Sequence, residues 1–229
     1  MTVGSDSTPD AAAAPRRRRQ SQRQLEASLE NRSAIVRSAL AVFAHYGYTK
    51  TTLQAVAERV GLTRTGLLHH FGSKEGLFLA VIEEGRRRAE RRAKQTAAGR
   101  GLDGIRGLRG ALGTGDKTGD EAGDEGVHVK FVQTLQGEAL HEDAPEYLVA
   151  SVRSRLSQIR NHVTMCLEQA RRDGEIGDVD IPALATMIAG TMNGLQVQWL
   201  LDESVQTEPA LGALVDLLAC TASRLSPPA

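Results

Sequence analysis

The stretch that decides the fold is TTLQAVAERVGLTRTGLLHHF, residues 51–71. It holds two apolar patterns with helical spacing, and Gly61 separates them at a corner. Thr51 and Gln54 have the Thr-x-x-Gln spacing of a capping box, and Thr63 is placed to cap the second helix. The pattern predicts a helix-turn-helix, the arrangement that presents its second helix to the major groove of DNA.

Helical patterns continue on both sides of this stretch. From Asn31, apolar residues recur at helical spacing, and Gly47 predicts the end of that first helix. Gly72 predicts the end of the short third helix, and Ser73 is placed to cap a fourth. The fourth helix is apolar in its first half and rich in Glu and Arg in its second, which indicates a solvated helix between two domains.

The remainder of the chain predicts a loop followed by further helices. Residues 99–126 are rich in glycine and predict a flexible surface loop with at most one weak helix. Four more helices are expected at about 127–140, 144–173, 181–201 and 208–225. The last two are apolar on more than one face, which predicts that they pack against another subunit.

Composition and charge divide the chain into two parts. Its 229 residues are 41% hydrophobic but only 3% aromatic, which suits packed helices better than sheets. Residues 1–74 hold eleven Lys and Arg against five Asp and Glu, whereas the remainder holds 17 against 23. A net charge of +6 on the first part indicates a polyanionic partner for that part.

Two further expectations concern the location of the protein and its N-terminus. No apolar run approaches the ~20 residues that a membrane span needs, and no apolar segment follows the N-terminal arginines, so a cytoplasmic protein is expected. Residues 1–30 are expected to form a disordered basic arm, because the first twenty have few large apolar groups. The sequence is equally compatible with DNA contacts by Arg16–Arg19 and with a solvated tail in which they contact only water.

The stretch GYTKTTLQAVAERVGLTRTGLLHHFGSKEGLFLAVI resembles the DNA-binding domain of the TetR family of bacterial transcriptional regulators, over about residues 31–80. The paired threonines, the AxxxG corner, the short helix ending in histidine and an aromatic residue, and the F-x-S-K-E linker carry this resemblance. It implies an all-α fold of about nine helices. A three-helix helix-turn-helix domain over 31–78 would be joined to a helical ligand-binding and dimerisation domain over 79–229.

The same resemblance implies a function. It implies a homodimeric repressor that binds a palindromic DNA operator, is released by a small-molecule ligand, and needs no cofactor. A non-specific or architectural DNA-binding protein and a regulator without a ligand remain alternatives. An enzyme is disfavoured, because we find no catalytic Ser/His/Asp or Cys/His arrangement, no phosphate-binding glycine loop and no HExxH motif.

The predicted DNA-binding residues lie at the N-termini of three predicted helices or at the end of the second helix of the motif. They are Thr51, Thr52, Gln54, Thr63, Arg64, Thr65, Gly66, His69, His70 and Lys74. The hydroxyls of Thr51 and Thr52 suit phosphates and Gln54 suits an adenine edge, with plain capping the alternative for all three. Arg64 suits a guanine edge or a phosphate, Thr65 suits a thymine methyl, and Lys74 suits a phosphate. Family members often carry Tyr in place of Leu68, so either Leu68 contacts a sugar or a thymine methyl, or His69 or His70 supplies the missing polar contact.

The sequence predicts no metal site and places a ligand pocket in the C-terminal domain. Adjacent helical residues point ~100° apart, so the histidine pair cannot chelate one ion side by side, and no metal is expected. A ligand pocket, if the protein has one, is expected in the C-terminal domain, and each of its candidate residues is also compatible with plain core packing. The candidates are Phe131, Gln136, His162, Met165, Met187, Met192 and Trp199.

Overall fold

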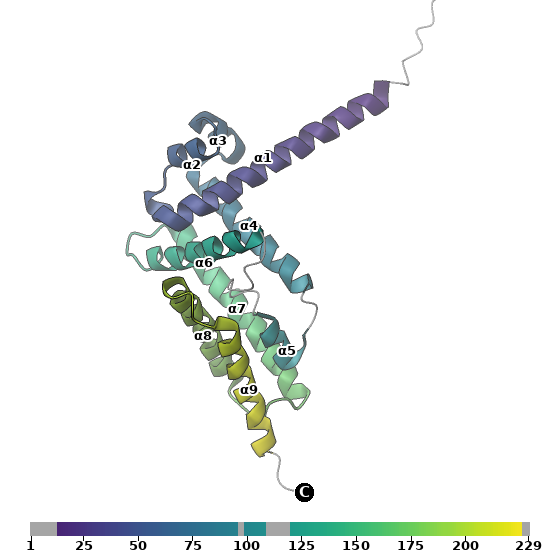
Figure 1. Cartoon of the computed structure of the whole chain (residues 1–229), viewed down its shortest axis with the longest axis vertical. Coiled ribbons are helices and arrows are strands. Elements are labelled where there is room, and N and C mark those ends of the chain that lie inside the picture. Colours follow the sequence, from purple (N-terminus) through teal and green to yellow (C-terminus); the bar gives the residue numbers. More distant parts are fainter. Residues whose placement is uncertain (1–12, 96–98, 109–119, 226–229) are drawn as a thin grey trace, which may run out of the picture.

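The described residues of the computed structural model, 13–95, 99–108 and 120–225, form an all-α fold of nine helices (Figure 1). These are α1 (Ala13–Lys50), α2 (Leu53–Arg59), α3 (Arg64–Phe71), α4 (Lys74–Gln95), α5 (Gly101–Arg106), α6 (Asp120–Glu138), α7 (Glu146–Arg172), α8 (Ile181–Leu201) and α9 (Thr207–Leu225). The prediction of an all-α fold with about nine helices is confirmed.

The boundaries of the later helices follow the sequence pattern closely, with one exception. Helix α8 has the predicted bounds, and α9 begins one residue earlier than predicted. Helix α6 begins at Asp120, so the loop expected over residues 99–126 is wrong for 120–126. Acidic residues such as those that open α6 suit a helix N-terminus, because they interact favourably with its dipole. The middle of the expected loop, 109–119, lies outside the described residues.

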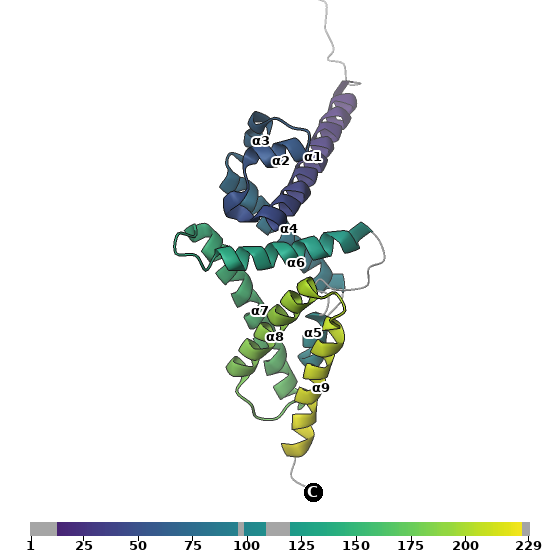
Figure 2. The ribbon, with the colours of Figure 1, turned by 60° about the vertical axis from the view of Figure 1, so that its left-hand side comes forward.

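Helix α1 begins well before the predicted globular domain. The expectation of a disordered arm over 1–30 is wrong from Ala13 onward, because α1 includes this segment and with it Arg16–Arg19. Alanine, arginine, glutamine and leucine dominate the segment, and all are strong helix formers without any need for burial. In Figures 1 and 2 this part of α1 extends away from the rest of the molecule. Residues 1–12 lie outside the described residues.

Gly47 interrupts α1 near its end. It adopts φ 78° and ψ 171°, a conformation that L side chains rarely adopt, and the predicted helix end at this glycine is confirmed. The backbone nitrogens of Tyr48 and Thr49 then donate to the carboxylate of Glu138 on α6, at 2.6 and 3.0 Å. Glu138, 90 positions from Tyr48 in the sequence, thus stabilises the interruption of α1.

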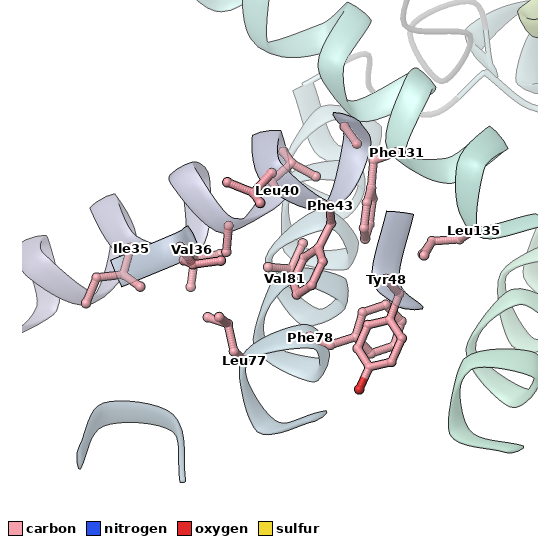
Figure 3. Close-up of a cluster of buried hydrophobic side chains, with 14 of the residues drawn as sticks. Ile35, Val36, Leu40, Phe43, Tyr48, Leu77, Phe78, Val81, Phe131 and Leu135 are labelled. Atoms are coloured by element: carbon pink, nitrogen blue, oxygen red, sulfur yellow. The ribbon is translucent and has the colours of Figure 1, made fainter. Parts of the chain in front are cut away.

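An aromatic cluster joins the N-terminal helices to α6 and α7. Phe43, Tyr48, Phe78, Phe131 and Tyr147 belong to it, and Figure 3 shows the first four among their aliphatic neighbours. The rings of Phe43 and Phe78 meet edge to face with centroids 6.0 Å apart, a favoured aromatic geometry. Because helices α1, α4, α6 and α7 each contribute a ring, a displacement of α6 disturbs the packing of α1.

A second hydrophobic core lies farther from α3. Leu102 and Ile105 of α5 pack there against α7, α8 and α9, including the fully buried Leu167 and Leu211. Figure 2 shows α6 crossing the molecule between α1–α3 on one side and α8 and α9 on the other. Helix α6 contacts both α1 and α8.

Candidate nucleic-acid interface

Helices α2 and α3 form the predicted corner, and each begins with a threonine cap. Thr52 Oγ1 accepts from the backbone nitrogen of Ala55 at 3.1 Å, and Thr63 Oγ1 accepts from Gly66 at 3.0 Å. Gly61 lies between the helices with φ 67°. The caps satisfy backbone donors that the first turn leaves unpaired, so both short helices have defined N-termini.

The predicted capping box is wrong by one residue. Thr51 is 3% exposed, and its hydroxyl donates to the carbonyl oxygen of Gly47 at 2.6 Å, while Thr52 is the actual cap. The Gln54 amide donates to Glu58 Oε1 at 2.8 Å instead of reaching back to the cap. The interruption at Gly47 leaves a carbonyl without its helical donor, and the Thr51 hydroxyl supplies one. Thr51 is consequently withdrawn from the set of DNA-binding candidates.

The other predicted residues remain on or near the surface of the motif. Those exposed are Thr52, Gln54, Thr63, Arg64, Thr65 and His69, and those half-buried are Gly66, His70 and Lys74. Leu67 points the opposite way and is fully buried, so it fixes which face of α3 is turned outward. Figures 1 and 2 place α3 at the end of the molecule opposite α9.

Arg32 fixes the C-terminal end of α3, a role that the sequence did not reveal. Its Nη1 donates to the carbonyl oxygen of His70 at 2.8 Å, and its guanidinium carbon lies 4.4 Å from the centre of the Phe71 ring. A cation over an aromatic face and a hydrogen bond to a terminal carbonyl both stabilise this helix end. His69 is the more exposed of the two histidines and His70 is half-buried.

The ammonium group of Lys74 contacts other residues of the protein. Nζ donates to the carbonyl oxygen of Thr49 at 3.1 Å and lies 4.4 Å from the centre of the Tyr48 ring. Burial lowers the pKa of Lys74 from its usual value, and the carboxylate of Glu138 acts in the opposite direction. Lys74 thereby ties the start of α4 to the end of α1, and two of its three N–H groups are left for another acceptor.

The seven predicted ligand-binding residues do not come together. Phe131 is buried in the aromatic cluster, Met165 and Met187 are exposed, and His162 Nε2 lies 3.6 Å from Cys166 Sγ. Trp199 is half-buried beside Gly126 of α6. Two of the seven candidates, Gln136 and Met192, line the cavity described next.

A small cavity lies between α6, α7 and α8. Its lining residues are Gln136, Arg155, Leu156, Ile159, Ala189, Met192, Asn193 and Gln196. Gln136 and Met192 were predicted, whereas Arg155 was missed. A signal was present, because Arg155 falls at helical spacing between Val152 and Ile159, on the apolar stripe of α7.

Neither a metal cluster nor a membrane span is found in the described part of the chain. No three His, Cys, Asp or Glu side chains among the described residues are grouped as metal ligands would be. None of the described helices combines the length and the apolar character needed to cross a bilayer.

The fold and the exposed second helix of the motif define a helix-turn-helix protein, and comparisons with known proteins agree. Residues 35–81 match the family profile described as "Bacterial regulatory proteins, tetR family". The Escherichia coli transcriptional regulator RutR is 40% identical over 53 residues, which are 23% of this chain and 25% of RutR. The Corynebacterium jeikeium repressor AcnR is 27% identical over 167 residues, or 72% of this chain and 79% of AcnR.

Solved structures extend the likeness to most of the fold. A TetR-family regulator from Agrobacterium tumefaciens superimposes with a TM-score of 0.68 at 18% identity, covering 83% of this chain and 98% of that one. FadR of Bacillus subtilis, in complex with stearoyl-CoA, gives 0.61 at 18% identity, covering 82% and 97%. The helix-turn-helix region over residues 35–81 is thus similar to that of the tetR family of bacterial regulatory proteins, and the solved structures share the all-α fold. The alignment with RutR spans about a quarter of that protein's length.

Proposed function

We propose that the protein is a sequence-specific transcriptional regulator of the bacterial cytoplasm and has no enzymatic activity. In this proposal it is a homodimeric repressor that binds a palindromic operator and is released by a small molecule. The observation that carries the proposal is the outward-facing, capped N-terminus of α3, held on the core by the buried Leu67. Regulators of this class place such a helix end against base edges in the major groove.

The chemistry of each exposed side chain indicates whether it would contact a base or a phosphate of the DNA. Arg64 and Thr65 open α3, where a guanidinium suits the acceptors of guanine and a threonine methyl suits thymine. The hydroxyls of Thr52 and Thr63 accept from the backbone as caps, so they retain their own proton to donate to phosphate. His69 is exposed and can supply the polar contact that Leu68 lacks.

An apolar stripe on α8 supports the dimer. Ala183, Met187, Gly190, Gly194, Val197 and Leu201 alternate in spacing between four and three residues, and we call this set the α8 stripe. Met187 is 64% exposed and Leu201 is 84% exposed, although both are large and apolar. Gly190 and Gly194 have open space where a side chain would stand, so another helix can approach closely. Leu217 continues the exposed apolar surface on α9.

The spacing of the α8 stripe supports a two-fold symmetric dimer. A stripe with alternating four- and three-residue spacing is self-complementary, because two copies related by a two-fold axis can interdigitate along it. Packing α8 and α9 against their symmetry mates gives a four-helix interface that removes the exposed methionine and leucines from water. A two-fold axis at this interface would present two α3 helices to two half-sites.

Helix α6 supports a route for ligand release. The amide nitrogen of Gln133 donates to Asn193 Oδ1 at 2.9 Å and to Gln196 Oε1 at 3.1 Å on α8, while Glu138 of the same helix holds the backbone after Gly47. A molecule that enters between α6 and α8 must displace α6, and with it the end of α1. The similarly folded FadR has a bound ligand, stearoyl-CoA.

Selection from a random duplex pool tests the proposed function. Purified protein should recover a palindrome whose half-sites lie about 10 base pairs, or a multiple of that, apart. The selected operator should bind at least ~10³-fold more tightly than scrambled DNA of equal length. A pool without enrichment would favour the architectural alternative instead.

Arg64→Ala is expected to weaken binding to the selected operator by ~1–3 kcal/mol, because it removes a side chain placed to read a base. Fluorescence anisotropy with the operator and with scrambled DNA measures the effect. Arg171→Ala, at an exposed arginine near the end of α7, is the matched control and should change neither affinity. Equal losses on both DNAs would assign Arg64 to a phosphate contact.

A further inference from the structure

We propose that the cavity between α6, α7 and α8 binds an anionic effector, and that Arg155 binds its carboxylate. This inference rests on the proposed function, since it names the chemical class of the molecule that would release the operator. The observation that carries this inference is the position of Arg155, which lines the cavity.

Arg155 is a cation without a counter-charge. Its residue is partly exposed, but Nε is enclosed and has no hydrogen-bond partner in the described structure. No ion pair to Arg155 is found among the described residues either, and the eight residues that line the cavity include no carboxylate. Burial lowers the pKa of Arg155 from its usual value. A half-buried guanidinium with an enclosed, unpaired Nε and no ion pair is destabilising, and a ligand that supplies an anion would satisfy it.

The walls of the cavity specify the rest of the ligand. Leu156, Ile159, Ala189 and Met192 supply apolar surface, and amide side chains supply the polar part. The carbonyl oxygen of Asn193 already accepts from Gln133, which leaves its amide nitrogen as the end that can donate. A guanidinium and an amide N–H together suit the two oxygens of a carboxylate, and the apolar wall suits an aliphatic chain. An amphipathic monocarboxylate meets both requirements.

The size of the cavity connects binding to release. The cavity is partly open to solvent, and the space within it is ≈ 20 Å³, room for only a water molecule or two. A carboxylate with a longer chain therefore enters only if α6 moves away from α8, and this movement separates Gln133 from its two partners. The shortest carboxylates should bind with little effect on DNA affinity, and longer ones should lower it.

The test uses the full chain and a defined series of probes. Sodium salts of straight-chain monocarboxylates from acetate to decanoate are compared with the primary alcohols of the same lengths, by thermal unfolding and by calorimetric titration. We expect the carboxylates to raise Tm more than the matching alcohols. Arg155→Met should weaken carboxylate binding by about ten- to a hundredfold and leave alcohol binding unchanged. Arg153→Met, at an exposed arginine of the same helix, is the control and should behave as wild type.

A second measurement needs no ligand. Methionine fills a similar volume without charge, so ligand-free Arg155→Met should unfold at the same temperature as wild type or at a higher one. The proposal is overturned if this variant unfolds at a lower temperature, or if no carboxylate stabilises wild type more than its alcohol. Operator binding by the same variant keeps the two proposals apart, because a regulator with no anion site would still select its palindrome.

Discussion

Replacing Val197 by arginine is expected to convert the protein from a dimer to a monomer and to weaken operator binding by a factor of about 10² or more. Val197 lies in the α8 stripe, close to Gly194, where a symmetry-related helix would approach most closely. An arginine there would bring two positive charges together across the two-fold axis and bury both without partners. A monomer retains one helix-turn-helix and loses the gain in affinity from binding two half-sites together.

Sedimentation velocity and operator titration measure the two parts of this prediction separately. Leu140→Arg is the matched control, because Leu140 is also apolar and 87% exposed but lies in the turn after α6, outside the α8 stripe. The control should remain a dimer with normal affinity. A dimeric Val197→Arg protein would place the interface elsewhere on the molecule, whatever its affinity for DNA.

Gly47→Ala is expected to destabilise the protein by about 3 kcal/mol, which lowers Tm by about 6–12 °C. Two effects add. The conformation at φ 78° and ψ 171° is one that alanine rarely adopts, and an added Cβ would lie 2.5 Å from Glu138 Oε1. Relief of that collision moves the carboxylate away from the backbone nitrogens of Tyr48 and Thr49, so two hydrogen bonds are lost as well.

Gly61→Ala separates the two effects. Gly61 also has a positive φ, 67°, but no neighbouring atom lies within 4 Å of the position that its Cβ would take. Its replacement should cost only ~1–2 kcal/mol, the conformational term alone. Thermal unfolding of both variants by circular dichroism gives the comparison, and equal losses would show that the contact with Glu138 contributes nothing.

The sequence predicted the parts of the fold that depend on local periodicity. Helices α7, α8 and α9 have long amphipathic or apolar patterns and clear ends, and Gly61 and Gly72 mark the corners around α3. The N-terminal part of α1 was harder to predict, because the sequence from Ala13 has no apolar stripe and only the helix propensity of its residues indicates a helix. The predicted capping box was also wrong for a local reason. Thr51 and Thr52 both suit a cap, but the Thr51 hydroxyl donates to the Gly47 carbonyl and Thr52 caps the helix.

Contacts between distant residues could not be predicted from local patterns. Arg32 and His70 are 38 positions apart, and Glu138 is 90 from Tyr48, so no local spacing points to either pair. Arg155 differs, because a cation on an apolar helical stripe was visible in the sequence. Its lack of a partner, in contrast, required the positions of α6 and α8.

The uneven distribution of aromatic residues gives the molecule two separate optical reporters. Trp199, the only tryptophan, lies on α8 beside Gly126 of α6, so its fluorescence responds to the spacing of these two helices. Tyr48 and Tyr147 lie in the aromatic cluster that joins α1 to α6 and α7, and their hydroxyls share a hydrogen bond. Their near-ultraviolet circular dichroism responds to that junction. Recorded with time after rapid mixing with a ligand, the two signals compare how fast the spacing of α6 and α8 and the junction of α1 with α6 and α7 change, with no label attached.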